Sequence, residues 1–190
     1  MMNKLFTPHN LADIQLKNRV VMAPMTRTRT LNDVADELVA LYYSQRASAG
    51  LIITEGLPVS EEGRGYLYTP GLYNEAQMHG WRKVTDAVHA KGGRIFAQLW
   101  HVGRMSHVSV LPENQAPVSS GTIPATNTTV FAYSDSGEPS AVTPSIPRAL
   151  ETEEVKHVTK DFVKSARLAI EAGFDGVEIM AANGFIFDQY

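Results

Sequence analysis

Polar and aromatic side chains follow short apolar runs of the sequence, at the point where each run ends. Thr26 follows the first run, Gln98 and Trp100 close the third, and Asn183 lies just past the fourth. If the runs are parallel strands, their carboxyl ends meet on one face of the fold, and these side chains converge there. A hydroxyl, two amides and an indole on one rim form a hydrogen-bonding surface suited to a planar heteroaromatic ligand.

Several other chemistries lack the residues they need. The chain has no cysteine, which excludes disulfides, thiolate metal sites and a cysteine nucleophile. No Gly-x-Ser-x-Gly motif is present, no Gly-x-Gly-x-x-Gly follows a predicted strand, and no pair among the six histidines has metal-ligand spacing with a carboxylate partner. The formal net charge of −3, without a run of Lys or Arg, argues against a nucleic-acid partner. With no signal-peptide pattern and no apolar stretch of about 18 residues, we expect a cytoplasmic protein without a membrane span.

The apolar runs are rich in β-branched and aromatic residues, which is typical of strands buried on both faces. These predicted strands occupy residues 20–25, 51–56, 94–100 and 176–180. Between them, apolar residues recur at helical spacing, which predicts helices over residues 35–49, 75–91 and 152–172. Asn74 is a suitable N-cap for the second helix, and Gly50, Gly92 and Gly173 are placed to end the three helices. Residues 184–190 resemble the start of a further helix.

Alternation of strands and helices predicts right-handed crossovers and a parallel sheet. We therefore predict the α/β class and a (β/α)8 barrel of the TIM type, with residues 1–190 forming a single partial domain that holds the first four β/α units only. A complete barrel typically takes about 250 residues. Residues 4–17, with a turn at Ala12-Asp13, are expected to form a hairpin that plugs the bottom of the barrel. Residues 103–150 are predicted to be a long loop on the face where barrel enzymes keep their active sites.

Three stretches of the chain carry a specific resemblance. They are Ala23-Pro24-Met25-Thr26-Arg27, Gln98-Leu99-Trp100-His101-Val102-Gly103-Arg104, and Gly173-Phe174-Asp175-Gly176-Val177-Glu178-Ile179 followed by Ala182-Asn183-Gly184. In this order, and over essentially all 190 residues, they resemble the old yellow enzyme family, and most of all its bacterial N-ethylmaleimide and nitroester reductase group. Arg64-Gly65-Tyr66 and Thr69-Pro70-Gly71 support the same match.

The resemblance implies a flavin mononucleotide (FMN) at the carboxyl-terminal mouth of the barrel. NADPH or NADH would reduce the flavin, and the flavin would pass a hydride to an activated alkene or a nitro compound. Carried over to this sequence, the resemblance implies that Pro24 and Thr26 lie against the flavin ring, with the Thr26 hydroxyl bonded to the ring edge. Gly56 would let the ring approach the backbone, and Gln98 would bond the pyrimidine side of the ring.

Tyr66 and Trp100 would line the substrate side of the same pocket, as the resemblance implies. Each of the implied residues also has a structural interpretation, as a strand end, a core aromatic or a loop residue. That interpretation is weakest for Gln98, because burying its amide without a partner would be costly. We expect structural rather than catalytic roles for His101 and Arg104.

Two positions depart from the pattern of an active family member. The family has a His where this chain has Met180, and that His acts with the residue three positions later, here Asn183, to clamp the substrate oxygen. A thioether cannot donate a hydrogen bond to a developing oxyanion, and losing one such donor typically costs about 10²–10³ in rate. The family's proton-donating Tyr is replaced by Phe185. We therefore expect alkene reduction to suffer more than nitro reduction.

The sequence leaves two functions open. One is an FMN-dependent oxidoreductase carried as its amino-terminal half, and the other is a catalytically impaired half barrel that serves as an assembly or interaction module. A half barrel has two open strand edges, which favour pairing with another chain, so we expect self-association or a complementing second half-barrel chain. We expect a small-molecule substrate (an enone, a maleimide or a nitro compound), no bound metal, and little flavin on the isolated chain.

Overall fold

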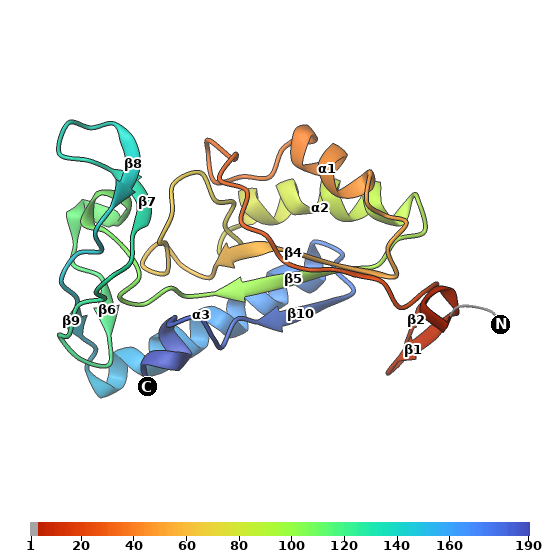
Figure 1. Ribbon diagram of the computed structural model, residues 1–190. Coiled ribbons are helices and arrows are strands. Elements are labelled where there is room, and N and C mark those ends of the chain that lie inside the picture. The colour runs from red at the N-terminus through yellow and green to blue at the C-terminus, as the bar shows by residue number, and fades with distance from the viewer. Residues whose placement is uncertain (1–3) are drawn as a thin grey trace.

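The structure is a computed structural model that describes residues 4–190, and the predicted α/β alternation is present in it (Figure 1). Its main sheet has the order β10-β5-β4-β3, and all three neighbouring pairs are parallel. These strands are β3 (Val21–Met22), β4 (Leu51–Pro58), β5 (Ile95–Trp100) and β10 (Gly176–Ile179). The helices are α1 (Glu37–Ser44), α2 (Glu75–His89) and α3 (Thr152–Glu171). Within the sheet, β3 and β10 are the two edges.

The helices pack on one face of the sheet and bury a common core. Its members include the sheet residues Ile52, Ile95 and Leu99 and, from the helices, Tyr43, Trp81, Val84 and Phe162. Helix α2 lies between the other two helices, since it contacts both α1 and α3. Each large side chain buried in this way contributes roughly 1.5–3 kcal/mol. The core therefore holds the sheet rigidly enough to position the side chains at its carboxyl end.

The predicted helix caps are partly confirmed. Asn74 is the N-cap of α2, and its side chain accepts a hydrogen bond from the Gln77 N–H at 2.9 Å. Gly92 and Gly173 follow α2 and α3 with φ values of +68° and +90°, which suit glycine at a helix end. The N-cap of α3 is Glu151, and its N–H donates to the Glu154 carboxylate at 2.7 Å.

Two predictions at the first β/α unit are wrong. The first strand is much shorter than residues 20–25, because only Val21 and Met22 pair with β4. Gly50 does not cap a helix, because α1 ends at Ser44 and turns follow it. A glycine is needed at this position for a different reason: a Cβ on Gly50 would lie 2.0 Å from the backbone oxygen of Asn18.

The predicted amino-terminal hairpin is present. Strands β1 (His9–Leu11) and β2 (Ile14–Leu16) pair antiparallel around a turn in which Ala12 has φ of +49°. The hairpin lies near the amino ends of the sheet strands, at the right of Figure 1. Leu16 is the buried residue of the hairpin, and β1 is exposed along its whole length in the described structure.

The long excursion after β5 has secondary structure of its own. Strands β7 (Val130–Tyr133) and β8 (Pro139–Val142) form a hairpin, and β6 (Val118–Ser119) pairs in parallel with β9 (Arg148–Ala149). Short 3₁₀ helices occupy Lys4–Phe6, Val108–Val110, Pro112–Asn114 and Ile186–Gln189. The last of them stands where the sequence predicts the start of a helix. Figure 1 places the excursion beyond the carboxyl ends of the strands, as predicted.

Among the described residues 4–190, no helix combines the length and the apolarity that crossing a membrane requires.

Candidate functional site

Several predicted site residues share the sheet face that points away from the helices. Gly56 pairs with Gln98, and Gln98 pairs in turn with Glu178 of β10. Side chains alternate along a strand, so Trp100 lies on the same face as Gln98, whereas Leu99 points into the helix core. The structure therefore brings Gly56, Gln98 and Trp100 together at the carboxyl end of the sheet.

A β-bulge in β4 makes this arrangement possible. The register between β4 and β5 shifts between Ile53 and Gly56. The Thr54 hydroxyl secures the bulge, since it accepts from the Gln98 N–H at 3.0 Å and donates to the Glu55 carbonyl at 2.8 Å. Because of the extra residue, Glu55 points toward α1, while Gly56 stays on the sheet face that points away from the helices.

Gln98 has a polar partner inside the chain. Its amide nitrogen donates to Glu178 Oε1 at 2.6 Å, and the Gln98 side chain is buried. Glu178 thus supplies one hydrogen bond to the buried amide, so the burial of Gln98 does not by itself require a ligand. The sequence analysis missed the role of Glu178, although an acidic residue in a short apolar strand could have suggested it.

Trp100 is the centre of an aromatic cluster at the rim. The ring centroids of Tyr66 and Phe185 lie 5.8 Å and 5.3 Å from that of Trp100, the latter edge to face at 87°. Met180 packs against the same cluster. The indole nitrogen of Trp100 is buried and has no hydrogen-bond partner among the described residues. A buried donor of this kind is costly unless a partner supplies an acceptor.

Asn183 lies in a turn with unusual backbone geometry. Asn183 and Gly184 have φ values of +60° and +70°, so two consecutive residues are left-handed. The Asn183 side chain is exposed, whereas Phe185 is buried. Ile186 N–H donates to the His101 carbonyl at 3.0 Å, which ties the turn to the end of β5.

Gln189 secures this turn, and the sequence analysis did not identify it. Its amide nitrogen donates to the carbonyls of Gly184 (2.7 Å) and Val102 (3.0 Å). Its amide oxygen accepts from the Arg104 N–H (3.1 Å) and the Ser119 hydroxyl (2.9 Å). One side chain thus joins the Asn183 turn, the end of β5 and the excursion. A single Gln gives no sequence pattern that predicts such a role.

Pro24 and Thr26 lie in the irregular segment that follows β3, and both are half-buried. The neighbouring Arg27 N–H donates to Glu55 Oε2 at 3.2 Å. Glu55 is 2% exposed, and burial raises the pKa of its carboxyl to about 7. This buried acid beside the Thr26 segment is a third residue, after Glu178 and Gln189, whose role the sequence analysis missed.

His101 and Arg104 both make hydrogen bonds within the described part of the chain, and the buried Nε2 of His101 has no hydrogen-bond partner there. His101 is fully buried, and its Nδ1 accepts from the Gly103 N–H at 3.1 Å. Burial lowers the pKa of His101 to about 4, so the imidazole is neutral at pH 7. Arg104 reaches into the excursion and donates to the Ile123 carbonyl at 3.0 Å.

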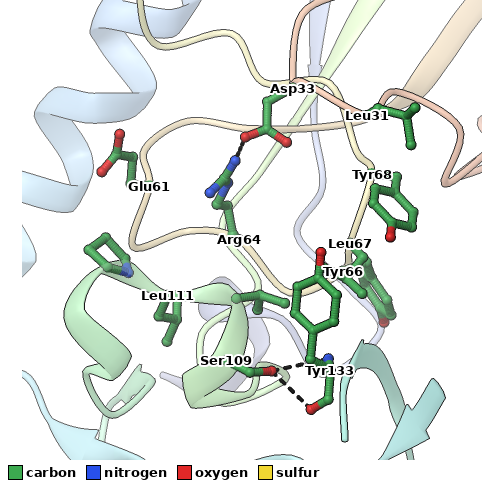
Figure 2. Close-up of a pocket in the computed structure, with 12 residues that line it drawn as sticks. Leu31, Asp33, Glu61, Arg64, Tyr66, Leu67, Tyr68, Ser109, Leu111 and Tyr133 are labelled. Atoms are coloured by element: carbon green, nitrogen blue, oxygen red, sulfur yellow. Dashed lines mark hydrogen bonds and ion pairs between the residues drawn. The ribbon is translucent and has the colours of Figure 1, made fainter. Parts of the chain in front are cut away.

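A cavity of about 330 Å³ adjoins Tyr66 (Figure 2). Its walls come from the loops after β3 and β4 and from the excursion after β5. Arg64 and Asp33 form an ion pair across it, and Tyr68 and Tyr133 supply hydroxyls from the opposite side. Asp33 and Tyr68 are both left-handed, with φ of +56° and +59°. The lining of the cavity therefore combines these charged and phenolic groups with apolar side chains, among them Leu31, Leu67 and Leu111.

No group of three or more His, Cys, Asp or Glu side chains within residues 4–190 is arranged to hold a metal ion.

The fold and the site define a partial α/β barrel with a polar, aromatic rim at the carboxyl ends of its strands.

Comparison with known proteins agrees with this class. The family model of the NADH:flavin oxidoreductase / NADH oxidase family matches residues 4–190. Rice (Oryza sativa subsp. japonica) 12-oxophytodienoate reductase 1 is 43% identical over 187 residues, which are 98% of this chain and 47% of that protein. Arabidopsis thaliana 12-oxophytodienoate reductase 2 is 41% identical over 187 residues, 98% of this chain and 49% of that protein.

Solved structures extend the comparison. Morphinone reductase in complex with tetrahydroNAD superimposes with a TM-score of 0.94 at 48% identity, covering 97% of this chain and 51% of that one. The old yellow enzyme homologue from Zymomonas mobilis gives a TM-score of 0.90 at 42% identity, covering 98% and 50%. The chain belongs to the old yellow enzyme family of NADH:flavin oxidoreductases. It spans about half the length of the relatives it matches.

Proposed function

We propose that this chain forms the flavin-ring and substrate side of an FMN-dependent NAD(P)H oxidoreductase that reduces activated alkenes or nitro compounds. The observation that carries the proposal is the rim formed by Gly56, Gln98 and Trp100, with its buried, unpartnered indole N–H. These residues fit a flat heteroaromatic ring, because they combine apolar faces with separate hydrogen-bonding groups. Bound FMN would supply the hydride, and the chain would hold the ring and the substrate.

On the cofactor side, Gln98 and Thr26 bond the flavin ring from two different strand ends. The Gln98 amide is already oriented by Glu178, so it can meet the ring without losing side-chain entropy on binding. Pro24 contributes an apolar face beside Thr26. Gly56 carries no side chain, and in the described structure the Trp100 ring occupies the space that a Cβ at this position would take.

On the substrate side, Tyr66 and Trp100 form the walls of the pocket, and Asn183 donates a hydrogen bond to the substrate's carbonyl or nitro oxygen. That oxygen gains negative charge as hydride arrives at the substrate, so a positioned amide N–H stabilises the transition state. Met180 and Phe185 add apolar surface but neither hydrogen bond nor proton. The proton that completes alkene reduction then comes from solvent.

The cavity shown in Figure 2 would extend the proposed pocket, because Tyr66 lines the cavity and also packs against Trp100. Substrates with a polar group remote from the reacting bond fit it, because Arg64, Tyr68 and Tyr133 offer donors at its wall. Small enones and nitro compounds would not reach these groups.

A second candidate function is a catalytically impaired half barrel that acts as an assembly module. The observation that favours it is the packing of Met180 and Phe185 onto Trp100 in one apolar cluster. The sheet edges β3 and β10 would then pair with a second copy or with a complementing half-barrel chain.

A chimaera tests the two proposals. Residues 1–190 are joined to the part of morphinone reductase that this chain does not match, and FMN content is measured after gel filtration. The first proposal predicts that the chimaera holds stoichiometric FMN. Gln98→Ala should lose this FMN, and the exposed control Gln115→Ala should keep it. NADPH- or NADH-dependent reduction of 2-cyclohexenone and of nitrobenzene is then compared. A folded chimaera that holds no FMN would overturn the first proposal and leave the assembly module as the better account.

A further inference from the structure

The backbone around Thr26 has few internal supports. Strand β3 ends at Met22, and the chain next enters a backbone hydrogen bond to another segment at Thr30, whose N–H donates to the Tyr68 carbonyl at 2.9 Å. Between these points, the Arg27 N–H donates to Glu55 Oε2 at 3.2 Å. This contact links the segment that carries Thr26 to the bulge that carries Gly56.

Glu55 is held at the bulge through both its carboxyl group and its backbone N–H. Tyr43 of α1 donates its hydroxyl proton to Glu55 Oε1 at 3.2 Å, and the same hydroxyl accepts from the Glu55 N–H at 2.8 Å. The carboxyl therefore receives two hydrogen bonds, from Tyr43 and from the Arg27 backbone, in a buried position. Both are donors, so both meet a charged acceptor only while Glu55 is a carboxylate.

The charged and ionisable groups around Glu55 come from two elements. The loop after β3 brings Arg27 and Arg29, and α1 with its N-cap brings Asp36, Tyr42 and Tyr43, around a cavity of about 130 Å³. Arg27 does not pair with Glu55 through its guanidinium. That group donates to the Tyr42 hydroxyl at 2.9 Å and lies 4.3 Å from the centre of the Tyr42 ring. The carboxyl thus lacks a direct ion pair among the described contacts.

We propose that Glu55 is a positioning residue: its carboxylate holds the Arg27 N–H and thereby fixes the Thr26 segment, and protonation of Glu55 weakens this hold. The first part of this proposal stands on the hydrogen bonds of Glu55 alone. Its consequence for flavin binding rests on the function proposed above, since it requires Thr26 to contact the ring.

The hydrogen bonds of Glu55 explain why protonation weakens the contact with the Arg27 N–H. A hydrogen bond to a carboxylate is roughly twice as strong as one between neutral groups. When Glu55 takes up a proton, one of its oxygens becomes a donor, and the Tyr43 hydroxyl can accept from it. The Arg27 N–H then faces a neutral acceptor and is held less tightly. Burial raises the pKa of Glu55 to about 7, so the change occurs near neutral pH.

The test follows the Arg27 amide by ¹H–¹⁵N NMR between pH 5.5 and 8.5. In the wild-type chain, the amide proton is expected to shift downfield as pH rises, with a midpoint near 7. Glu55→Gln should abolish the shift, because it cannot ionise, while Glu171→Gln, at an exposed site, should leave it unchanged. Tyr43→Phe removes a donor to the carboxylate and should move the midpoint to higher pH.

An Arg27 amide that does not titrate in the wild type, or that titrates equally in Glu55→Gln, would overturn the proposal. The flavin arm is measured separately, as the dissociation constant of FMN across the same pH range. Affinity is expected to rise several-fold from pH 6 to 8 in the wild-type chain or chimaera and to be flat in Glu55→Gln. If no FMN binds, the proposed function fails, and the amide titration still decides the role of Glu55.

Discussion

The indole of Trp100 lies directly over the Cα of Gly56 on the neighbouring strand. A Cβ built on Gly56 would come within 2.2 Å of the indole ring, closer than any real carbon contact. The glycine is therefore required by Trp100 in the described structure, and not only by a ligand. The two residues act as one unit of the rim, since any side chain at position 56 must displace the aromatic cluster.

Gly56→Ala should consequently destabilise the chain by about 1–3 kcal/mol, the usual cost of overpacking a filled site. It should also change the fluorescence of Trp100, because the ring has to move. Urea unfolding followed by fluorescence measures both effects. Gly121→Ala is the matched control, because no atom lies within 4 Å of a Cβ at that position. Equal stability of the two variants would show that the Trp100 contact is not what requires Gly56.

Gln189→Met should loosen the Asn183 turn. Methionine keeps the length of the side chain but removes the four hydrogen bonds of the amide, leaving the carbonyls of Gly184 and Val102 without that donor. We expect a loss of about 2 kcal/mol, in the range for buried polar groups left unsatisfied. Hydrogen exchange at the Arg104 amide should accelerate. Gln115→Met, at an exposed position, should change neither quantity.

Stability should depend on pH through two buried groups with opposite signs. Glu55 has its folded-state pKa raised from 4.5 to about 7, so it binds a proton more tightly when folded, and its stabilising contribution is lost as pH rises from 4.5 to 7. His101 has its pKa lowered from 6.5 to about 4, so its contribution is lost as pH falls from 6.5 to 4. Between pH 4.5 and 6.5 the two slopes oppose one another.

The Glu55 contribution is isolated by comparing the wild type with Glu55→Gln. The difference in unfolding free energy should fall by about 1.4 kcal/mol per pH unit between pH 5 and 6.5, with the variant gaining relative stability as pH rises. Urea titrations at half-unit pH intervals measure it. A pH-independent difference would mean that Glu55 keeps an ordinary pKa in the folded chain.

Most helices and strands could be predicted from the sequence, because apolar spacing and helix-capping residues act over a few neighbouring positions. β10 and α2 are read from apolar spacing, and Asn74 and Gly173 from the backbone needs of helix ends. The bulge at Thr54 and Glu55 has no such local cause. Strict alternation along β4 would place Gly56 on the helix side, and only the register with β5 reveals that it faces the rim. The hydrogen bonds of Glu55 and Gln189 join segments distant in sequence, so no single stretch predicts them.

Restoring a hydrogen-bond donor and a proton donor at the rim should raise alkene reduction in the chimaera. Met180→His would add a second donor beside Asn183, worth about 10²–10³ in rate for an oxyanion site. Phe185→Tyr would add a general acid, worth about 10²–10⁴, more for alkenes than for nitro compounds. Steady-state rates with 2-cyclohexenone and with nitrobenzene separate the two effects. Phe187→Tyr, two residues away and half exposed, is the control for Phe185→Tyr. The chimaera without these substitutions could instead reduce the enone as fast as the double variant. Met180 and Phe185 would then not limit the rate of alkene reduction, and their packing against Trp100 would be compatible with full catalysis.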